Sequence, residues 1–141
     1  GIADGRGFIA AMALGAEGVQ VGTRFICAQE CSVHPDYQQK IIKARDRATV
    51  VCGETTGHPV RAIHNKFTRA YLNYEKSNRN IEELEAMGKG RYPAAAVHGD
   101  IDGGTVLAGQ ISGLIKEVQT AEEIVLDIIN HAVEVKQGLE V

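Results

Sequence analysis

The sequence predicts an α/β fold in which one helix–strand unit is followed by a mostly helical extension with a short hairpin. Residues 5–15 carry an apolar stripe at helical spacing that includes Phe8 and Met12, and Gly15 stands where a helix C-cap belongs. Residues 18–22 form a short apolar run between glycines, which is typical of a buried parallel strand. Beyond this unit, apolar residues recur mainly at helical spacing. At 141 residues, the chain can form one compact domain.

Local signals place the elements that follow. A helix begins at Pro35, a residue favoured in the first helical turn, and runs to about Ala44. The turn-rich residues 53–59 separate two β-like runs, which predicts a hairpin. The predicted ranges are a helix over 23–30, a helix over 35–44, hairpin strands over 48–52 and 60–63, and a helix over 66–74 that Asn65 caps.

Capping-box patterns place the later helices. Asn80 and Thr120 each stand three residues before a glutamate and just ahead of an apolar run, so they predict helices over 81–87 and 121–136. Between these two, residues 103–116 combine branched apolar residues with small ones, which predicts a further, closely packed helix. The last helix is expected to bury Val125, Ile128, Ile129, Ala132 and Val135.

Composition excludes several classes of function. The formal net charge is −3, from 15 Lys and Arg against 18 Asp and Glu, so nothing favours binding to a nucleic acid. The sequence contains no long uncharged apolar run, so we expect no membrane-spanning helix and no membrane partner. The cysteines Cys27, Cys31 and Cys52 are odd in number, which favours a reducing, cytoplasmic location over a disulfide framework.

The predicted strand has no parallel partner in the sequence. An isolated parallel strand cannot satisfy its backbone hydrogen bonds. The chain also opens on a glycine-rich turn of the kind that normally follows a strand. We therefore expect a fragment that begins just after a strand, or a chain that pairs with another copy, and we expect a homodimer.

Two glycine turns are the candidate binding elements. The first, residues 1–7, leads into a helix, and the second, Gly22 with Thr23, stands at the end of the predicted strand and before the next helix. Backbone N–H groups at a helix start are unpaired and favour an anion, and glycine lets a phosphate approach the main chain. One such turn alone is more often only a tight turn. The pair favours a phosphate, because α/β barrels bind one after their seventh and eighth strands.

These turns and the later motifs carry a family resemblance. GIADGRG at residues 1–7 is followed by GAEGVQVGTRF at 15–25, GHPVRAIHN at 57–65 and HGDIDGGTVLAGQISG at 98–113. The combination resembles the C-terminal part of the flavin-dependent nitronate monooxygenase and enoyl-acyl-carrier-protein reductase II family, over nearly the whole chain. The stretch at 98–113 is more similar to the enoyl reductases than to the nitronate oxidases.

The resemblance implies the C-terminal portion of a TIM (β/α)8 barrel that binds FMN. Residues 1–31 would end the FMN-binding barrel, residues 32–104 would form a helix and hairpin insertion, and residues 105–141 would form helices that pack on the barrel. The family's catalytic histidine lies in a His-x-Gly-x-x-Gly segment that this chain does not contain, so we assign no catalytic residue. We also assign no metal ligand. The residues implied in holding the FMN phosphate are Gly1, Ile2, Ala3, Gln20, Val21, Gly22 and Thr23.

The reaction implied by the resemblance is the reduction of an enoyl thioester in fatty acid synthesis. FMN would be the cofactor, reduced nicotinamide (NADH or NADPH) the co-substrate, and an acyl-carrier-protein thioester the substrate. Three alternatives stay open: a nitronate monooxygenase (2-nitropropane dioxygenase), an inactive packing or dimerisation fragment, and another phosphate-binding barrel such as the IMP dehydrogenase group. The TRF that follows Gly22 and the GDIDGG stretch argue against the last of these.

Two further groups of residues have simpler structural interpretations. Cys27, Cys31 and His34 offer three zinc ligands, but no fourth is near, and packed or partly exposed thiols are the more frequent arrangement. Asp100 and Asp102 lack the remaining ligands of a calcium loop, so we expect them in a turn.

A run of basic residues follows the helix that begins at Pro35. Lys40, Lys43, Arg45 and Arg47 are interrupted by an aspartate and would spread around a helix. Charges of this kind usually lie on a solvated face, which is the arrangement we expect here.

Overall fold

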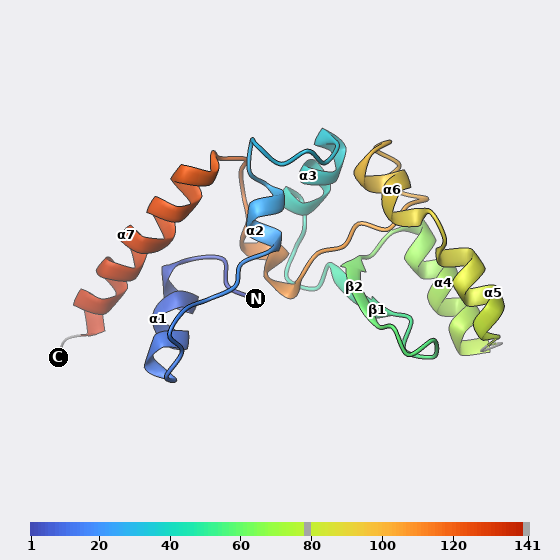
Figure 1. The fold of residues 1–141 in the computed structure, drawn as a ribbon, viewed down its shortest axis with the longest axis horizontal. Coiled ribbons are helices and arrows are strands. Elements are labelled where there is room, and N and C mark those ends of the chain that lie inside the picture. The colour runs from blue at the N-terminus through green and yellow to red at the C-terminus, as the bar shows by residue number, and fades with distance from the viewer. Residues whose placement is uncertain (78–79, 140–141) are drawn as a thin grey trace.

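The computed structural model describes residues 1–77 and 80–139. In Figure 1, α1 and α7 lie at one end of the molecule, the hairpin with α4 and α5 lies at the other, and α2 and α3 lie between them. Along the chain the elements are α1 (Gly5–Ala13), α2 (Thr23–Ile26), α3 (Pro35–Ile42), β1 (Thr49–Cys52), β2 (Val60–Ile63), α4 (Lys66–Ser77), α5 (Ile81–Gly88), α6 (Arg91–Ala96), the 3₁₀ helix η1 (Gln110–Leu114) and α7 (Ala121–Leu139).

The hairpin is the one ladder of the described residues, and it confirms the prediction. β1 and β2 pair antiparallel, with Thr49 opposite Ile63 and Cys52 opposite Val60. The connection turns at Gly53, whose φ of 84° lies in the left-handed region that glycine adopts without strain. A buried glutamate that sequence reasoning missed holds this turn: the Glu75 carboxylate of α4 accepts hydrogen bonds from the backbone N–H groups of residues 53 (3.3 Å) and 55 (2.9 Å).

The helix predicted over residues 103–116 is wrong, because residues 106–108 of this segment are held alongside β2. The Ile63 N–H donates to the Val106 carbonyl (2.8 Å), and the Ala108 N–H donates to the Arg61 carbonyl (3.2 Å). Backbone groups engaged with a neighbouring strand cannot form helical hydrogen bonds as well. Only Gln110–Leu114 turns helical, as the 3₁₀ helix η1.

Two other local predictions need correction. Residues 18–22 form no strand, because the described residues offer them no parallel neighbour, and a strand without neighbours leaves its backbone groups unpaired. The helix predicted over 23–30 is shorter and ends at Ile26. Helix α6, at Arg91–Ala96, was not predicted; it contains a proline and begins after Gly90, which has a φ of 75°. The start of α3 at Pro35 is confirmed.

Helices α1 and α7 pack closely through a glycine. A Cβ atom placed on Gly5 would lie 2.2 Å from the Ala132 nitrogen and 2.4 Å from the His131 carbonyl carbon, both of them backbone atoms. On α7, Ile124, Ile128 and Ala132 are buried. Glycine at position 5 therefore lets the two helix backbones approach more closely than any side chain would allow.

The opposite face of α7 is apolar and exposed. Val125, Leu126, Ile129 and Val133 keep between 44% and 51% of their surface exposed. The predicted buried stripe is therefore right for Ile128 and Ala132 but wrong for Val125 and Ile129, because α1 covers only one side of the helix. Within the described part of the chain, no helix combines the length and the apolar character needed to cross a membrane.

Candidate functional site

Three backbone segments meet next to the N-terminus of the chain. The Gly109 N–H donates to the Thr23 hydroxyl (2.9 Å), and the Ile111 side chain lies against Gly1, where an added Cβ would be 3.0 Å from the Ile111 Cγ2. Figure 1 shows the N-terminus beside the lower end of α2. Since Gly109 and Ile111 are two residues apart, the first and second glycine turns contact the same short stretch of chain.

The first turn offers fewer amides than its sequence suggests. The Asp4 carboxylate is the N-cap of α1 and accepts hydrogen bonds from the N–H groups of Arg6 (3.0 Å) and Gly7 (3.4 Å). The Arg6 guanidinium hydrogen bond to Asp4 (2.6 Å) and the cap itself hold the pKa of this carboxyl below its usual value. Asp4 is therefore ionised at neutral pH and occupies the helix N-terminus itself. The backbone N–H groups of Ile2 and Ala3 precede the cap and have no acceptor among the described residues, so they are open to a ligand.

The second turn is open beside Gly22 and anchored at Thr23. A Cβ atom added to Gly22 would meet nothing within 4 Å, so the main chain there can be approached closely. The Thr23 hydroxyl already accepts from Gly109 but keeps its own proton, so it can donate one hydrogen bond. The next side chain, Arg24, is buried and already paired: it donates to the Glu117 carbonyl (3.4 Å) and to the Gln119 side chain.

The structure brings part of the predicted set together. Gly1 and Thr23 both contact the 109–111 segment, and Gly22 adjoins Thr23. Gln20 is exposed and Val21 is half-buried in the loop that leads into this turn. Sequence reasoning missed the 109–111 segment as part of the site because it placed these residues inside a helix. The signal that could have found them is the AGQISG stretch, whose first glycine, Gly109, bonds Thr23.

Cys27, Cys31 and His34 do not gather into a metal site. No cluster of three or more His, Cys, Asp or Glu side chains suited to a metal occurs among residues 1–77 and 80–139. Burial raises the pKa of the Cys27 thiol to about 11, so this thiol stays protonated at neutral pH. The His34 ring instead accepts a hydrogen bond from the Asp36 N–H (3.2 Å) at the start of α3.

The GDIDGG stretch is a turn, as predicted, and it is fastened to α4. The Gly103 N–H donates to the Asp100 carboxylate (2.7 Å), while Asp102 pairs with Lys66 (2.9 Å). The buried Asn65 side chain accepts from the Thr68 N–H and donates to the carbonyls of residues 101 and 104, each within 2.9 Å. This turn sets where the following segment, residues 105–111, begins its path to Thr23.

An apolar pocket of about 200 Å³ opens beside this segment. Leu107 forms one wall of the pocket and stands two residues before Gly109, whose N–H bonds Thr23. The pocket therefore lies within roughly 10 Å of Thr23. Burial raises the pKa of the Cys52 thiol in its wall to about 11, which keeps that thiol neutral. The lining residues that give the pocket its apolar character are Cys52, Val60, Phe67, Tyr71, Tyr92 and Leu107.

Comparisons with known proteins assign the chain to a family. The family model described as nitronate monooxygenase matches residues 1–131. Proteins named probable nitronate monooxygenase are 30% identical over 96% of the chain in Staphylococcus saprophyticus and 33% identical over 97% in Staphylococcus aureus strain MSSA476. The chain spans 38% of the length of each of these relatives.

Solved structures show the same relationship. FabK from Thermotoga maritima is 43% identical, with a TM-score of 0.93 over 98% of this chain and 44% of that protein. A nitroalkane oxidase from Streptomyces ansochromogenes is 26% identical, with a TM-score of 0.79 over 99% of this chain and 39% of that protein. These matches confirm the fold class predicted from the sequence, the C-terminal portion of an α/β barrel followed by a mostly helical extension. The chain therefore belongs to the nitronate monooxygenase family of flavin-dependent oxidoreductases.

Proposed function

We propose that the protein containing this chain reduces enoyl-acyl-carrier-protein thioesters with FMN as cofactor and reduced nicotinamide as co-substrate. The contact of both glycine turns with residues 109–111 supports the proposal, because it holds the two turns to the same short stretch of chain while Gly22 stays open. A cytoplasmic location, a homodimer and the division at residues 31 and 104 belong to the same proposal.

The residues present suit the phosphate of FMN. The N–H groups of Ile2 and Ala3 and the hydroxyl proton of Thr23 can donate to phosphate oxygens, and the open side of Gly22 leaves room for them. Gln20 and Val21 belong to the loop that positions Gly22. FMN, when bound, supplies the relay of a hydride from the reduced nicotinamide to the β-carbon of the thioester. The part of this chain is to fix the cofactor's phosphate, and thereby the place of its ring.

Two observations favour an enoyl thioester over a nitronate. Among the solved structures, identity is 43% with FabK and 26% with the nitroalkane oxidase, and the HGDIDGG and AGQISG motifs resemble the enoyl reductases. In addition, the apolar pocket beside Leu107 offers a site for an acyl chain, which burial of apolar surface would hold. A small nitronate needs no such pocket.

Nitronate oxidation is the second candidate function. The names of the matched curated relatives favour it, at 30% and 33% identity. The phosphate site proposed here would serve that reaction equally well, since the same cofactor is involved.

The test uses the full-length protein, purified with its flavin. We expect it to oxidise reduced nicotinamide only when a 2-enoyl thioester is added, with one saturated thioester formed for each nicotinamide consumed. The matched assay supplies a nitronate and oxygen in place of the thioester. Turnover of the nitronate without turnover of the thioester would establish the second candidate instead.

A further inference from the structure

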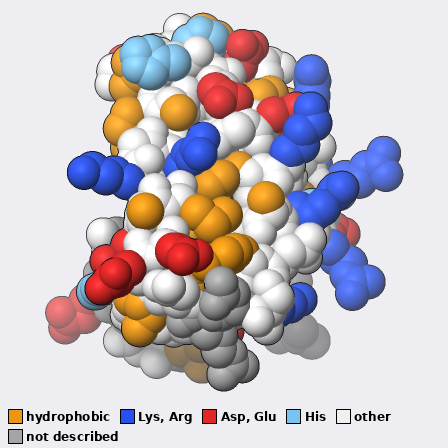
Figure 2. All heavy atoms as spheres, turned by 90° about the vertical axis from the view of Figure 1, so that its right-hand side faces the viewer, with side chains coloured by type: hydrophobic (Ala, Val, Ile, Leu, Met, Phe, Trp, Pro, Cys, Tyr) orange, Lys and Arg blue, Asp and Glu red, His pale blue; other side chains and the backbone are white. Residues whose placement is uncertain are grey.

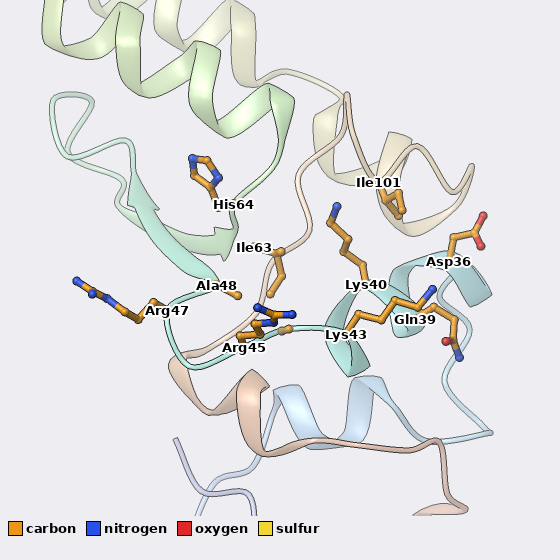
Figure 3. Close-up of a pocket in the computed structure, with 11 residues that line it drawn as sticks. Asp36, Gln39, Lys40, Lys43, Arg45, Arg47, Ala48, Ile63, His64 and Ile101 are labelled. Atoms are coloured by element: carbon orange, nitrogen blue, oxygen red, sulfur yellow. The ribbon is translucent and has the colours of Figure 1, made fainter.

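A groove of about 670 Å³ combines an apolar floor with a basic rim, between α3 and the end of β2. Its floor consists of Ala44, Ala48, Ile63 and Ile101. Figure 3 shows Lys40 on α3, Lys43 at the C-cap of this helix and Arg45 in the turn that follows, with Arg47 extending away at the other end of the groove. The basic lining residues are Lys40, Lys43, Arg45, Arg47 and His64, and the acidic one is Asp36.

Most of this positive charge is uncompensated. Lys43, Arg45 and Arg47 are exposed, and no carboxylate of the described residues lies within ion-pair distance of them. Lys40 is the exception, since it lies 3.7 Å from Asp102. The exposure expected from the sequence is confirmed for Lys43, Arg45 and Arg47 but not for Lys40, which is half-buried, and the charges are concentrated around one groove instead of being spread around a helix. This occurs in a chain whose net charge is −3.

Basic and apolar side chains also lie next to each other at one end of the molecule. Figure 2 shows the end formed by the hairpin and α4–α5, where basic side chains project along one edge and apolar side chains form a strip down the middle. The groove differs because its cations surround an apolar floor. A surface of this kind suits an amphipathic segment whose carboxylates meet the rim while its apolar side chains cover the floor.

The groove adjoins the proposed cofactor site without being part of it. Helix η1 joins the two: Gly109 at its start bonds Thr23, and Gly113 near its end packs on the backbone of Arg45 and Asp46, 3.1 Å from the position of an added Cβ. A 3₁₀ helix rises about 2 Å per residue, so the separation is on the order of 10 Å. A partner seated in the groove would lie beside the proposed phosphate site.

We propose that this groove docks the acidic surface of the acyl carrier protein that presents the thioester, an inference that rests on the proposed function. The carrier would bind outside the cofactor site and extend its thioester-bearing arm into it. Opposite charge across such an interface speeds encounter and fixes orientation, and salt weakens it.

The experiment reverses the charges of the groove in the full-length flavoprotein. The variant is Lys43→Glu/Arg45→Glu/Arg47→Glu, and the matched control, Lys76→Glu/Lys89→Glu/Lys136→Glu, makes the same charge change at exposed positions elsewhere. A crotonyl group is supplied either on a bacterial acyl carrier protein or on N-acetylcysteamine, and kcat/KM is measured for each. Binding of the crotonyl carrier protein is titrated separately, at low and high salt.

We expect the groove variant to lose at least about tenfold in kcat/KM for the carrier-borne substrate and in carrier affinity. Its kcat/KM for the N-acetylcysteamine thioester should equal that of the wild type, and the control variant should match the wild type with both. Equal losses with both substrates would show that the groove serves the reaction site or the fold, and unchanged kinetics with the carrier would show that docking occurs elsewhere. Either result overturns the inference while leaving the proposed function intact.

The titration separates the two proposals. If the wild type reduces neither thioester, the proposed function fails, and the binding titration alone then tests the groove. Docking is overturned if the wild type does not bind the carrier protein, or if the groove variant binds it as tightly as the wild type does. Displacement of the carrier by low-millimolar inorganic phosphate would indicate a small-anion site, which also overturns it.

Discussion

Thr23 is the residue at which two segments of the proposed cofactor site are joined. Its hydroxyl accepts from the Gly109 N–H and can still donate to a ligand. Valine has the same shape but neither capacity, so Thr23→Val should release flavin, whereas Thr23→Ser should retain it. The measurement is the flavin-to-protein ratio of the full-length protein after gel filtration. Equal ratios in the two variants would mean that the hydroxyl has no part in holding the cofactor.

Gly22 tests the charge of the ligand at the same turn. Its surroundings are empty and its φ of −106° is open to any residue, so Gly22→Asn should fold normally. Gly22→Asp has the same size but adds a negative charge, and should lose flavin if a phosphate binds there. Retention of flavin by the aspartate variant would place the phosphate elsewhere.

Gly5 shows how a glycine can be required by packing and not by backbone conformation. It lies in a regular helix, yet an added Cβ would overlap backbone atoms of α7 that cannot rotate away. We expect Gly5→Ala to lower the free energy of unfolding by about 3 kcal/mol. The control is Gly7→Ala in the same helix, whose Cβ would meet only the flexible Ile2 side chain at 3.1 Å. That change should stay within about 1 kcal/mol of the wild type, measured by urea denaturation.

At the scale of elements, Asn65 joins the start of α4 to the GDIDGG turn. Its buried side-chain amide makes three hydrogen bonds. The amide oxygen accepts from the Thr68 N–H and caps the helix, and the NH2 group donates to the carbonyls of residues 101 and 104. Asn65→Asp keeps the cap but loses both donors and brings a carboxylate toward two carbonyl oxygens. We expect a loss of about 3 kcal/mol in unfolding free energy, from the unsatisfied buried groups.

The comparison for this prediction is the exposed cap of α5. Asn80→Asp makes the same chemical change at an exposed side chain that accepts from the Glu83 N–H (3.3 Å) and donates one hydrogen bond to the Glu83 carboxylate (3.3 Å). Its cost should be below about 1 kcal/mol, because water solvates the new charge. Similar midpoints for the two variants in thermal unfolding would show that the bonds to residues 101 and 104 contribute little.

Local signals predicted those elements whose cause is local. The capping box before α7 forms as expected, with the Glu123 N–H donating to the Thr120 hydroxyl (3.2 Å) and the Thr120 N–H to the Glu123 carboxylate (2.7 Å). The hairpin and the helix at Pro35 likewise follow from turn and first-turn residues. The 103–116 segment failed the same reasoning because its partner, β2, lies about 40 residues earlier, and no pattern within the segment reveals it.

At the scale of the whole molecule, the outer face of α7 indicates a missing neighbour. Val125, Leu126, Ile129 and Val133 form an exposed apolar surface, and the chain spans 38% of the length of its matched relatives. We expect a longer protein to cover this face. In that protein Ile129→Asp would bury an unpaired charge and lower Tm by on the order of 10 °C.

The neighbouring change Asn130→Asp supplies the control, since Asn130 is already polar and exposed. It adds the same charge one position along the helix and should leave Tm nearly unchanged. If both variants unfold at the wild-type temperature, the outer face of α7 stays in contact with water in the longer protein as well.

The sequence by itself determined the family, the fold class, the hairpin, the capped helices and the positions of the two glycine turns, because motifs, caps and turn residues act within a few positions of one another. Only the tertiary structure decided that residues 109–111 join those turns, that Asp4 occupies the N-terminus of α1, and that the basic residues after α3 surround an apolar groove. Each of these depends on contacts between segments far apart in the chain. Such contacts form where buried surface and paired backbone groups stabilise them, and local residue patterns carry no record of that choice.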